Sequence, residues 1–433
     1  MTDNGKRTAY VNARLLDPAS GLDTKGALLT EGAEIRDLGP KLFADGVPEG
    51  IERIDCKGHC LAPGLIDARV QLGEPGYEHK ETMTTASLAA GAGGVTTMLC
   101  LPNTDPVIDE IALVELVKRR ARDAGPVNIH PYAAITKELA GEQITEMGLL
   151  AEAGAVAFTD GTSAVGNAMT FRRALDYALT FDLLIVQHPE DPDLANGGVM
   201  NEGELATRLG LAGIPAAAET ILLERDLRLL ELTGGRYHAA HLSTADAIAA
   251  VRRAKEKGLN VTCETAPPYF ALNETAVGDY RTFAKLSPPL RDETDRKAVI
   301  EGLKDGTIDL IASDHAPHDQ DSKRIPFVQA ENGIIGLETL LPLTLELHHN
   351  GSLPLLRALE AVTVAPARVF QLAGGVLAKG KPADLVLFDL EKPWQIDVEK
   401  FRSKSKNSPF DGRPVQGIVL RTVANGQPIF VRE

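Results

Sequence analysis

Residues 308–318 read IDLIASDHAPH, a short apolar run that ends in a cluster of aspartate and histidine. An apolar run of this length, bounded by polar residues, is typical of a strand buried on both faces of a parallel sheet. Asp314, His315 and His318 follow at the carboxyl end of that strand, where barrel enzymes hold their reactive groups. The stretch therefore predicts a buried strand with a functional site at its end.

The same pattern occurs repeatedly upstream. The earlier runs are GLIDARVQL near Leu65, GVTTMLCLP near Thr97, PVNIHPYAAI near Ile129, AVAFTD near Phe158, LLIVQHPE near Val186, YHAAHLS near Ala240 and NVTCETAPP near Cys263. Amphipathic segments between them predict helices at residues 108–124, 171–179, 216–232, 245–257 and 292–304. Eight strands that alternate with helices predict an α/β protein built on a (β/α)8 TIM-like barrel.

The two ends of the chain differ from the middle. Residues 9–38 and the stretch after residue 374 alternate apolar and polar residues, with turn signals and no long helix. We expect a small composite β-sandwich from residues 1–58 and 374–433, and a barrel from residues 59–373.

Composition and charge exclude several classes of protein. The 433 residues are 44% apolar and 24% charged, an ordinary globular balance. The net charge of −15 opposes binding to phosphate backbones, so we expect no nucleic-acid partner. No apolar run approaches the roughly 18 residues that span a bilayer. With no apolar secretory signal at the start and no disulfide pattern among the four cysteines, the sequence predicts a cytoplasmic protein without membrane association.

Two polar segments allow two interpretations each. Residues 401–412 (FRSKSKNSPFDG) predict either a solvated loop or a docking segment. Residues 319–332 predict either a mobile cover over the barrel mouth or a plain surface loop.

Polar side chains recur at the expected carboxyl ends of successive strands. A single histidine in such a place is usually a hydrogen-bonded core residue. Imidazoles and carboxylates that recur at one end of a barrel instead favour zinc-type ligation, with an aspartate as general base. The candidates are Asn103, Asp160, His188, His241, Asp314 and His318.

Longer segments carry a resemblance to a known family. They include APGLID, EPGYEHKETMTTASLAAGAGGVTTMLCLPNTDPVID, HPED, HLSTADAI, SPPLR, IASDHAPH, GIIGLETLLPL and SKSKNSPFDG. With them the sequence resembles the bacterial long-chain dihydroorotases of the amidohydrolase superfamily over nearly its whole length. The resemblance implies a zinc centre at the barrel mouth and the reversible cyclisation of carbamoyl aspartate to dihydroorotate in pyrimidine biosynthesis.

Four positions depart from the pattern of active members. The first barrel strand of that family ends in His-x-His, followed two residues later by an arginine that binds the substrate carboxylate. Here the histidine positions hold Arg69 and Gln71, and the arginine position holds Gly73. An asparagine before Pro-Pro-Leu-Arg is replaced by Ser287. The resemblance therefore identifies Arg69 and Gln71 as lost metal-ligand positions and Gly73 and Ser287 as lost substrate positions.

The remaining residues could hold at most one metal ion. Asp160, His188 and His241 form a remnant three-ligand set for a single zinc. The guanidinium of Arg69 repels a cation, and we expect it to pair with Asp160 or Asp314 in place of a metal.

Two functions from different classes follow from the resemblance. The first is a catalytically inactive dihydroorotase-like chain that forms a homo- or hetero-oligomer and serves as a structural or regulatory partner of aspartate carbamoyltransferase, with no cofactor. The alternative is an active dihydroorotase with one zinc, in which Asp314 is the base and Asn103 and His318 contact the substrate. A hydantoinase- or allantoinase-like activity is a third possibility, but PNTDP and SKSKNSPF match dihydroorotases better.

Overall fold

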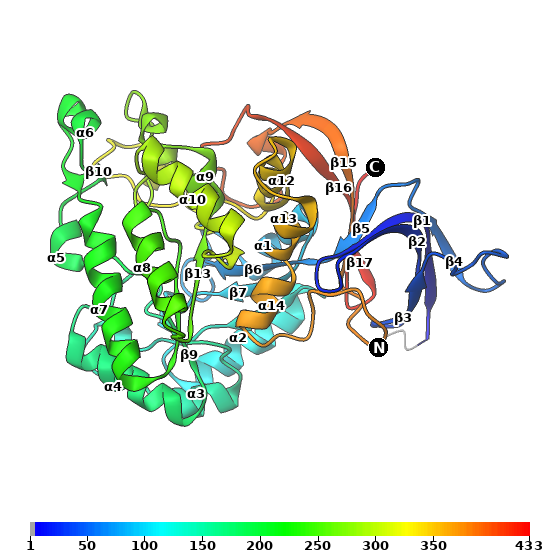
Figure 1. Cartoon of the computed structure of the whole chain (residues 1–433), viewed down its shortest axis with the longest axis horizontal. Helices are drawn as coiled ribbons and strands as arrows, with labels where there is room; N and C mark the ends of the chain where they lie inside the picture. Colours follow the sequence, from blue (N-terminus) through cyan, green and yellow to red (C-terminus); the bar gives the residue numbers. More distant parts are fainter. Residues whose placement is uncertain (1–4) are drawn as a thin grey trace.

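Strands from both ends of the chain form one sheet, which lies toward the right of Figure 1. The computed structural model describes residues 5–433. The sheet has eight strands in the order β17-β16-β15-β5-β1-β2-β3, with β4 also paired to β1. Their bounds are β1 Arg7–Asp17, β2 Leu22–Glu31, β3 Glu34–Gly39, β4 Glu52–Asp55, β5 Cys60–Pro63, β15 Leu385–Gln395, β16 Pro414–Ala424 and β17 Gln427–Val431.

Strand β5 joins the two ends of the chain. It pairs in parallel with β1 and antiparallel with β15, so N-terminal and C-terminal strands share one hydrogen-bonded ladder. Leu15, Leu28, Leu61 and Leu387 pack together in the apolar core of this sheet. The sheet therefore extends to residue 63, beyond the limit at residue 58 that the sequence suggested.

Parallel strands form the barrel, and the predicted fold class is confirmed. The strands are β6 Leu65–Val70, β7 Val95–Cys100, β8 Asn128–Pro131, β9 Leu184–Gln187, β12 Arg236–Ala239, β13 Val261–Thr265 and β14 Leu310–Ile311. The predicted fourth strand is reduced to one residue, Phe158, which bridges in parallel to Ala133 on one side and Ile185 on the other. A parallel bridge between Val70 and His315 connects the first strand to the last.

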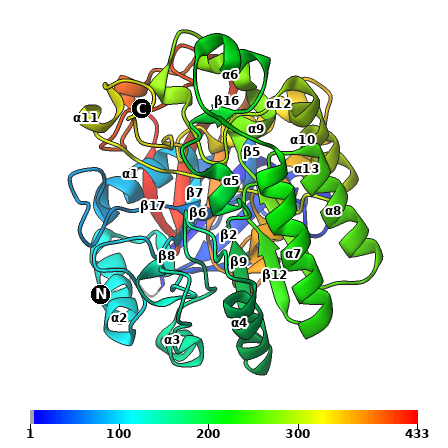
Figure 2. The same cartoon turned by 90° about the vertical axis from the view of Figure 1, so that its left-hand side faces the viewer.

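Helices surround these strands, as Figure 2 shows. The larger ones are α1 Met83–Gly93, α2 Ile111–Ala124, α3 Met147–Ala153, α4 Ala168–Thr180, α7 Ala217–Thr233, α8 Ala245–Glu256, α10 Glu293–Asp305, α12 Leu340–His349, α13 Leu355–Glu360 and α14 Val364–Val369. Short elements in the connections are α5 Pro192–Ala195, β10 Met200–Asn201, α6 Glu204–Leu209, β11 Gly213–Ile214, α9 Pro267–Ala271 and α11 Gln320–Lys323. Side-chain caps fix several starts: Asn167 caps α4, Thr244 caps α8 and Asp292 caps α10.

The interior of the barrel below its mouth is mostly apolar, but it contains one buried polar pair beside Phe370, in which His238 Nε2 lies 3.3 Å from Glu264 Oε2. Ile66, Leu99, Val186 and Leu310 from four strands pack with Phe370, which follows α14. Polar groups gather above this layer, at the carboxyl ends of the strands, as in other barrels. The fold therefore positions the candidate site residues on rigid strand ends.

Of the two interpretations of residues 401–412, a solvated loop or a docking segment, the structure favours docking for residues 401–408, here called the strap. Ser403, Ser405 and Asn407 are almost completely buried. The Asn407 side chain accepts from the backbone N–H of His318 and donates to the carbonyls of Ala316 and Gly333. The strap is thus a segment that docks onto the barrel mouth of its own chain.

Within residues 5–433, no helix combines the length and apolar character needed to cross a bilayer.

Candidate functional site

A cavity of about 480 Å³ opens at the carboxyl ends of the barrel strands. Of the residues singled out in the sequence, its walls include Gln71, Gly73, Asn103, His241, Ser287, Asp314 and His318. The other three, Arg69, Asp160 and His188, are buried and do not line it. The structure thus brings most of the candidate residues to one place.

Arg69 lies on β6 and forms an ion pair with Asp314, which follows β14. Its Nε donates to Asp314 Oδ1 at 2.9 Å, and its Nη2 donates to the carbonyl of Gly161 at 2.8 Å. The arginine side chain is only 1% exposed and the aspartate 13%. Of the two carboxylates that the sequence allowed as partners, Asp314 is the one in contact with Arg69.

Two histidines continue this ion pair into a chain of hydrogen bonds. His241 Nδ1 lies 3.0 Å from Asp314 Oδ2, and His241 Nε2 lies 2.7 Å from His188 Nδ1. On the far side, His188 Nε2 is 3.5 Å from Glu190 Oε2. Because His241 Nδ1 donates to a carboxylate, its Nε2 must accept from His188. We call these five residues, from Arg69 to Glu190, the charge chain.

The charge chain keeps His241 neutral and Asp314 ionised. Burial and the nearby charge of Arg69 lower the pKa of His241 to about 4. Burial alone would raise the pKa of Asp314, but His241 and Arg69 outweigh it, so that this pKa lies below the usual range for aspartate. Both carboxylate oxygens of Asp314 are therefore engaged by the protein itself.

Asp160 faces a different part of the structure. Its Oδ1 accepts from the backbone N–H groups of Ile135 and Thr136, each at 2.9 Å, and its Oδ2 accepts from the Thr136 hydroxyl. Burial outweighs these bonds and raises the pKa of Asp160 to about 6. The carboxylate thus anchors the segment that follows β8.

At both lost substrate positions the residue is committed to contacts within the chain. Gly73 has φ +69°, and a Cβ there would lie 2.8 Å from the backbone carbonyl oxygens of Tyr77 and Glu81. Only glycine suits this turn without strain. Ser287 donates its hydroxyl to Glu190 Oε2 at 3.1 Å.

The remaining candidates, Gln71, Asn103 and His318, line the cavity and are less fully hydrogen-bonded to the rest of the chain. The Asn103 amide donates to Gln71 Oε1 over 3.4 Å. His318 Nε2 donates to the carbonyl of Asn332 at 2.8 Å, while its buried Nδ1 has no partner among residues 5–433. Burial and the charges of Lys80 and Lys323 lower the pKa of His318 to about 4, so that Nδ1 is an unprotonated acceptor.

Two buried lysines hold residues 326–333 over one side of the cavity. Lys323 Nζ donates to the carbonyls of Glu331 and Gly333 at 2.6 and 3.1 Å. Lys285 Nζ donates to the carbonyls of Val328 and Ala330 at 2.9 and 2.7 Å. Residues 331–333 line the cavity, so the two lysines hold one of its walls in place. We call residues 326–333 the cover.

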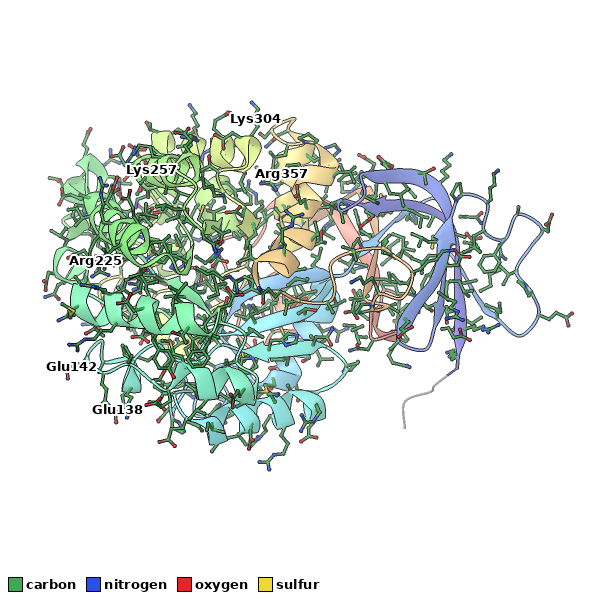
Figure 3. The ribbon with its side chains drawn as sticks, turned by 60° about the horizontal axis from the view of Figure 1, so that its bottom comes forward. Glu138, Glu142, Arg225, Lys257, Lys304 and Arg357 are labelled. Carbon is green, nitrogen blue, oxygen red and sulfur yellow. The ribbon has the colours of Figure 1, made fainter. Side chains whose placement is uncertain are left out.

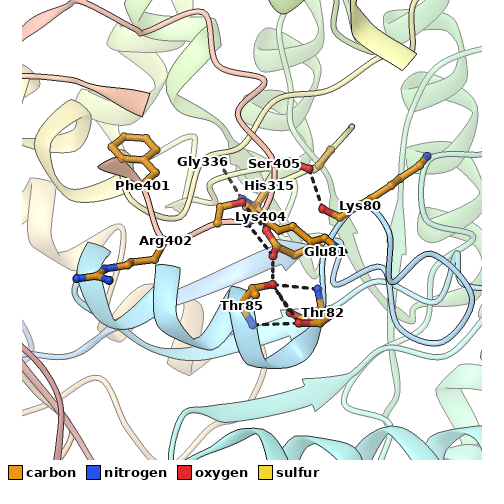
Figure 4. Close-up of polar contacts among 12 residues, drawn as sticks. Lys80, Glu81, Thr82, Thr85, His315, Gly336, Phe401, Arg402, Lys404 and Ser405 are labelled. Carbon is orange, nitrogen blue, oxygen red and sulfur yellow. Dashed lines mark hydrogen bonds and ion pairs between the residues drawn. The ribbon is translucent and has the colours of Figure 1, made fainter. Parts of the chain in front are cut away.

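A second buried pair, not predicted from the sequence, lies beside Asp314. His315 Nδ1 accepts from the backbone N–H of Gly336 at 3.0 Å, which leaves Nε2 protonated and 3.6 Å from Glu81 Oε2. Glu81 also accepts from the hydroxyls of Thr85 and Ser403 and from the N–H of Lys404 (Figure 4). The signal was the alternation of serine with basic residues in the strap, which marks one face of that segment as buried.

Comparisons with known proteins agree with this architecture. A family model described as "Dihydro-orotase-like" matches residues 58–247, and one described as "Amidohydrolase family" matches residues 339–430. A curated dihydroorotase of Anaplasma phagocytophilum (strain HZ) is 50% identical over 99% of this chain and 96% of its own length. The chain belongs to the dihydroorotase family. A dihydroorotase of Pelobacter propionicus is 46% identical over 97% of this chain and 99% of its own length.

Solved structures with the same fold include hydantoinase-type members of the amidohydrolase superfamily. The L-hydantoinase of Arthrobacter aurescens has a TM-score of 0.88, with 26% identity, 99% of this chain covered and 96% of its own. The dihydropyrimidinase of Brevibacillus agri has a TM-score of 0.85, with 22% identity, 98% of this chain covered and 95% of its own. Both support a barrel with a β-sandwich domain.

Amidohydrolases usually bind zinc, but the donors here do not fit a zinc ion in their present arrangement. The expected remnant set of Asp160, His188 and His241 is not assembled, because Asp160 binds residues 135–136 and the two imidazoles bind each other. Among residues 5–433 no three histidine, cysteine, aspartate or glutamate side chains converge in a metal-binding group. The Arg69 guanidinium also places a fixed positive charge against Asp314. Asp160, His188 and His241 therefore do not converge as a three-ligand set among the described residues.

Proposed function

We propose that this member of the dihydroorotase family takes part in pyrimidine biosynthesis as a catalytically inactive partner of aspartate carbamoyltransferase. The observation that carries the proposed inactivity is the buried ion pair between Arg69 and Asp314. Asp314 is the residue that would act as the base in an active member. In this chain it is held by an arginine at a position where the family has an imidazole.

Freeing Asp314 for chemistry would be unfavourable. Its two oxygens bind Arg69 and His241, and removal of the Arg69 guanidinium leaves a buried charge uncompensated. Breaking a buried ion pair in this way commonly costs about 3–5 kcal/mol. A base that must first give up such a pair is a poor proton acceptor at neutral pH.

Recognition of the substrate carboxylate is weakened independently. Gly73 offers no side chain, and the Ser287 hydroxyl is used by Glu190. Charge-assisted hydrogen bonds of the kind lost here contribute roughly 1.5–3 kcal/mol each. Two such losses would weaken binding by about two to four powers of ten.

The proposed partner role rests on the resemblance and on the preserved scaffold. The sheet and barrel cover the whole described chain, although the metal and substrate positions have changed. A fold kept intact around an altered site is what a role in assembly requires. The partner itself, aspartate carbamoyltransferase, is inferred from the family resemblance alone.

An active dihydroorotase is the second candidate. It is favoured by the relatives of about 50% identity that carry the name dihydroorotase. This function would require His188 and His241 to separate and Arg69 to leave Asp314.

Zinc content and turnover, measured with and without the partner, separate the two candidates. The purified chain is assayed for bound zinc and dihydroorotate hydrolysis, alone and with aspartate carbamoyltransferase. We expect no turnover, well under one zinc per chain, co-elution with the carbamoyltransferase and a rise in its activity. Turnover that disappears in the Asp314→Ala variant would instead establish the enzyme.

A further inference from the structure

The strap presents one polar face inward and one basic face outward. Ser403, Ser405 and Asn407 are buried, whereas Arg402, before Ser403, and Lys404, between the two serines, are exposed. This period of two is that of an extended segment with opposite faces in different environments. In Figure 4 the Arg402 side chain points away from the hydrogen bonds around Glu81.

The outward cations have no carboxylate at ion-pair distance within residues 5–433. Lys404 Nζ donates to the carbonyl of Glu78 at 2.7 Å, and Arg402 has no side-chain partner there. The carboxylates that do touch the strap, Glu81 and Glu338, are largely buried and accept from its backbone N–H groups. Neither cationic head therefore forms an ion pair with a carboxylate among the described residues, although Lys404 binds a backbone carbonyl.

This is unusual for so acidic a chain. The sequence has 60 aspartate and glutamate residues against 45 lysine and arginine, yet residues 401–410 contain three cations and no carboxylate. Many exposed cations elsewhere are paired, for example Arg252 with Asp305 and Arg253 with Glu224. The strap is therefore a local positive surface on a negative molecule.

The loop of residues 77–80 reaches the edge of the cavity and adds Lys80 to this surface, although it also carries the exposed carboxylate of Glu78. The Ser405 hydroxyl donates to the carbonyl of Lys80 at 2.7 Å, which fixes the loop of residues 77–80 against the strap. Lys80 Nζ lies 5.3 Å from the ring centroid of Tyr77 and also has no carboxylate partner in the described chain. Tyr77, 37% exposed, adds an aromatic surface next to the cations.

We propose that Arg402, Lys404 and Lys80 bind an acidic segment of a partner protein. The backbone that carries them is held in place by the buried hydrogen bonds of Ser403, Ser405 and Asn407. Because this backbone is already ordered, little conformational entropy is lost on binding, which favours affinity. Complementary charge supplies both attraction and orientation. The inference does not depend on which protein supplies the segment.

The experiment uses fluorescein-labelled octaglutamate as the probe, with its anisotropy followed in a titration with the full chain at about 50 mM salt. The test variant is R402Q/K404Q. The control is R172Q/K257Q, which has the same net charge but removes cations already paired with Asp176 and Glu231. Lys257 lies at the end of α8, on the outer face of the barrel (Figure 3).

We expect R402Q/K404Q to bind the peptide at least about fivefold more weakly, and the control to stay within about twofold of the wild type. Both variants should keep the wild-type Tm, because all four side chains are largely exposed. Equal binding by both variants, or no binding by the wild type, overturns the proposal. Strap-dependent self-association without peptide binding also overturns it, because the occupant would then be a second copy.

The result is separable from the partner role proposed above. Wild-type co-elution with aspartate carbamoyltransferase, combined with no peptide binding, contradicts the strap surface alone. Strap-dependent peptide binding without co-elution supports the surface and contradicts that partner.

Discussion

At the scale of single residues, the fixed charge of Arg69 decides the state of the barrel mouth. The Arg69 side chain is only 1% exposed, and its Nε lies 2.9 Å from Asp314 Oδ1, so it takes up one of the two carboxylate oxygens. Replacing Arg69 with methionine leaves Asp314 buried against His241 alone. We expect the free energy of unfolding to fall by about 3–5 kcal/mol, measured by urea denaturation.

The matched control for this change is Arg172→Met on α4. Arg172 pairs with Asp176 at 3.6 Å but is 45% exposed, and exposed pairs contribute only about 0–1 kcal/mol. If the two substitutions destabilise equally, the Arg69 ion pair has no special role.

A substitution at Gly73 tests whether this position can accept a side chain, as restoring the lost arginine would require. A side chain there meets both an unfavourable φ of +69° and two carbonyl oxygens at 2.8 Å. Gly141 has a similar φ of +72°, but a Cβ added there would meet no other group within 4 Å among residues 5–433, so a substitution at Gly141 measures the backbone strain alone. We expect Gly141→Ala to cost about 1 kcal/mol and Gly73→Ala at least twice as much, compared by thermal unfolding. Equal losses would show that the turn can relax to admit a side chain.

The sequence revealed the changed residues of the site but not their contacts. Arg69, Gln71, Gly73 and Ser287 stand out because intact motifs surround them. That Arg69 binds Asp314 was not decidable, because Asp160 was expected at the same end of the barrel. The orientation of Asp160 depends on its hydrogen bond with the Thr136 hydroxyl, and no motif in the sequence predicts that contact.

At the scale of elements, the cover over the cavity makes stability depend on pH. Burial and the charge of Lys285 lower the pKa of Lys323 from 10.5 to about 7. The unfolded chain therefore binds more protons than the folded chain between these values, and stability increases as pH rises. Among the groups facing Lys323, burial also lowers the pKa of Lys285, with the same sign, while Glu331 opposes the shift.

Raising the pH from about 7 to about 9 should add about 2 kcal/mol to wild-type stability through Lys323. The Lys323→Met variant should lose most of that increase, measured by urea denaturation at several pH values. Lys297→Met, at a side chain that is 68% exposed, is the control and should keep the wild-type dependence. A Lys323→Met profile parallel to the wild type would mean that Lys323 titrates normally in the folded chain.

Elements with strong periodicity were predictable, whereas elements defined by their neighbours were not. Helix α10 begins at its Asp292 cap within a residue of the expected start. The fourth barrel strand has only Phe158 as a bridge, although residues 156–159 form backbone hydrogen bonds with residues 131–133 on one side and 184–186 on the other. The strap was open to misinterpretation because its buried serines and asparagine are satisfied by groups distant in sequence.

At the scale of the whole molecule, the C-terminal part of the composite sheet contacts the helices of the barrel. The Thr422 hydroxyl of β16 donates to the carbonyl of Gly91 on α1. Arg413 donates from Nε and Nη2 to the two carboxylate oxygens of Glu346 on α12, each at 2.9 Å. The sequence indicated a composite sheet, but not that its last strands would support barrel helices.

Ending the chain after residue 413 tests this coupling. The truncation removes β16 and β17, exposes the edge of β15 and uncovers α1 and α12. Because buried apolar surface and the Thr422 bond are lost together, we expect no cooperative unfolding transition and recovery mainly as aggregate. The control inserts Gly-Ser-Gly after Asp45, in an exposed connection of the same sheet, and should keep a single transition near the wild-type Tm. A truncated chain that unfolds cooperatively would show that the barrel folds without the C-terminal strands, and that the composite sheet is an appendage.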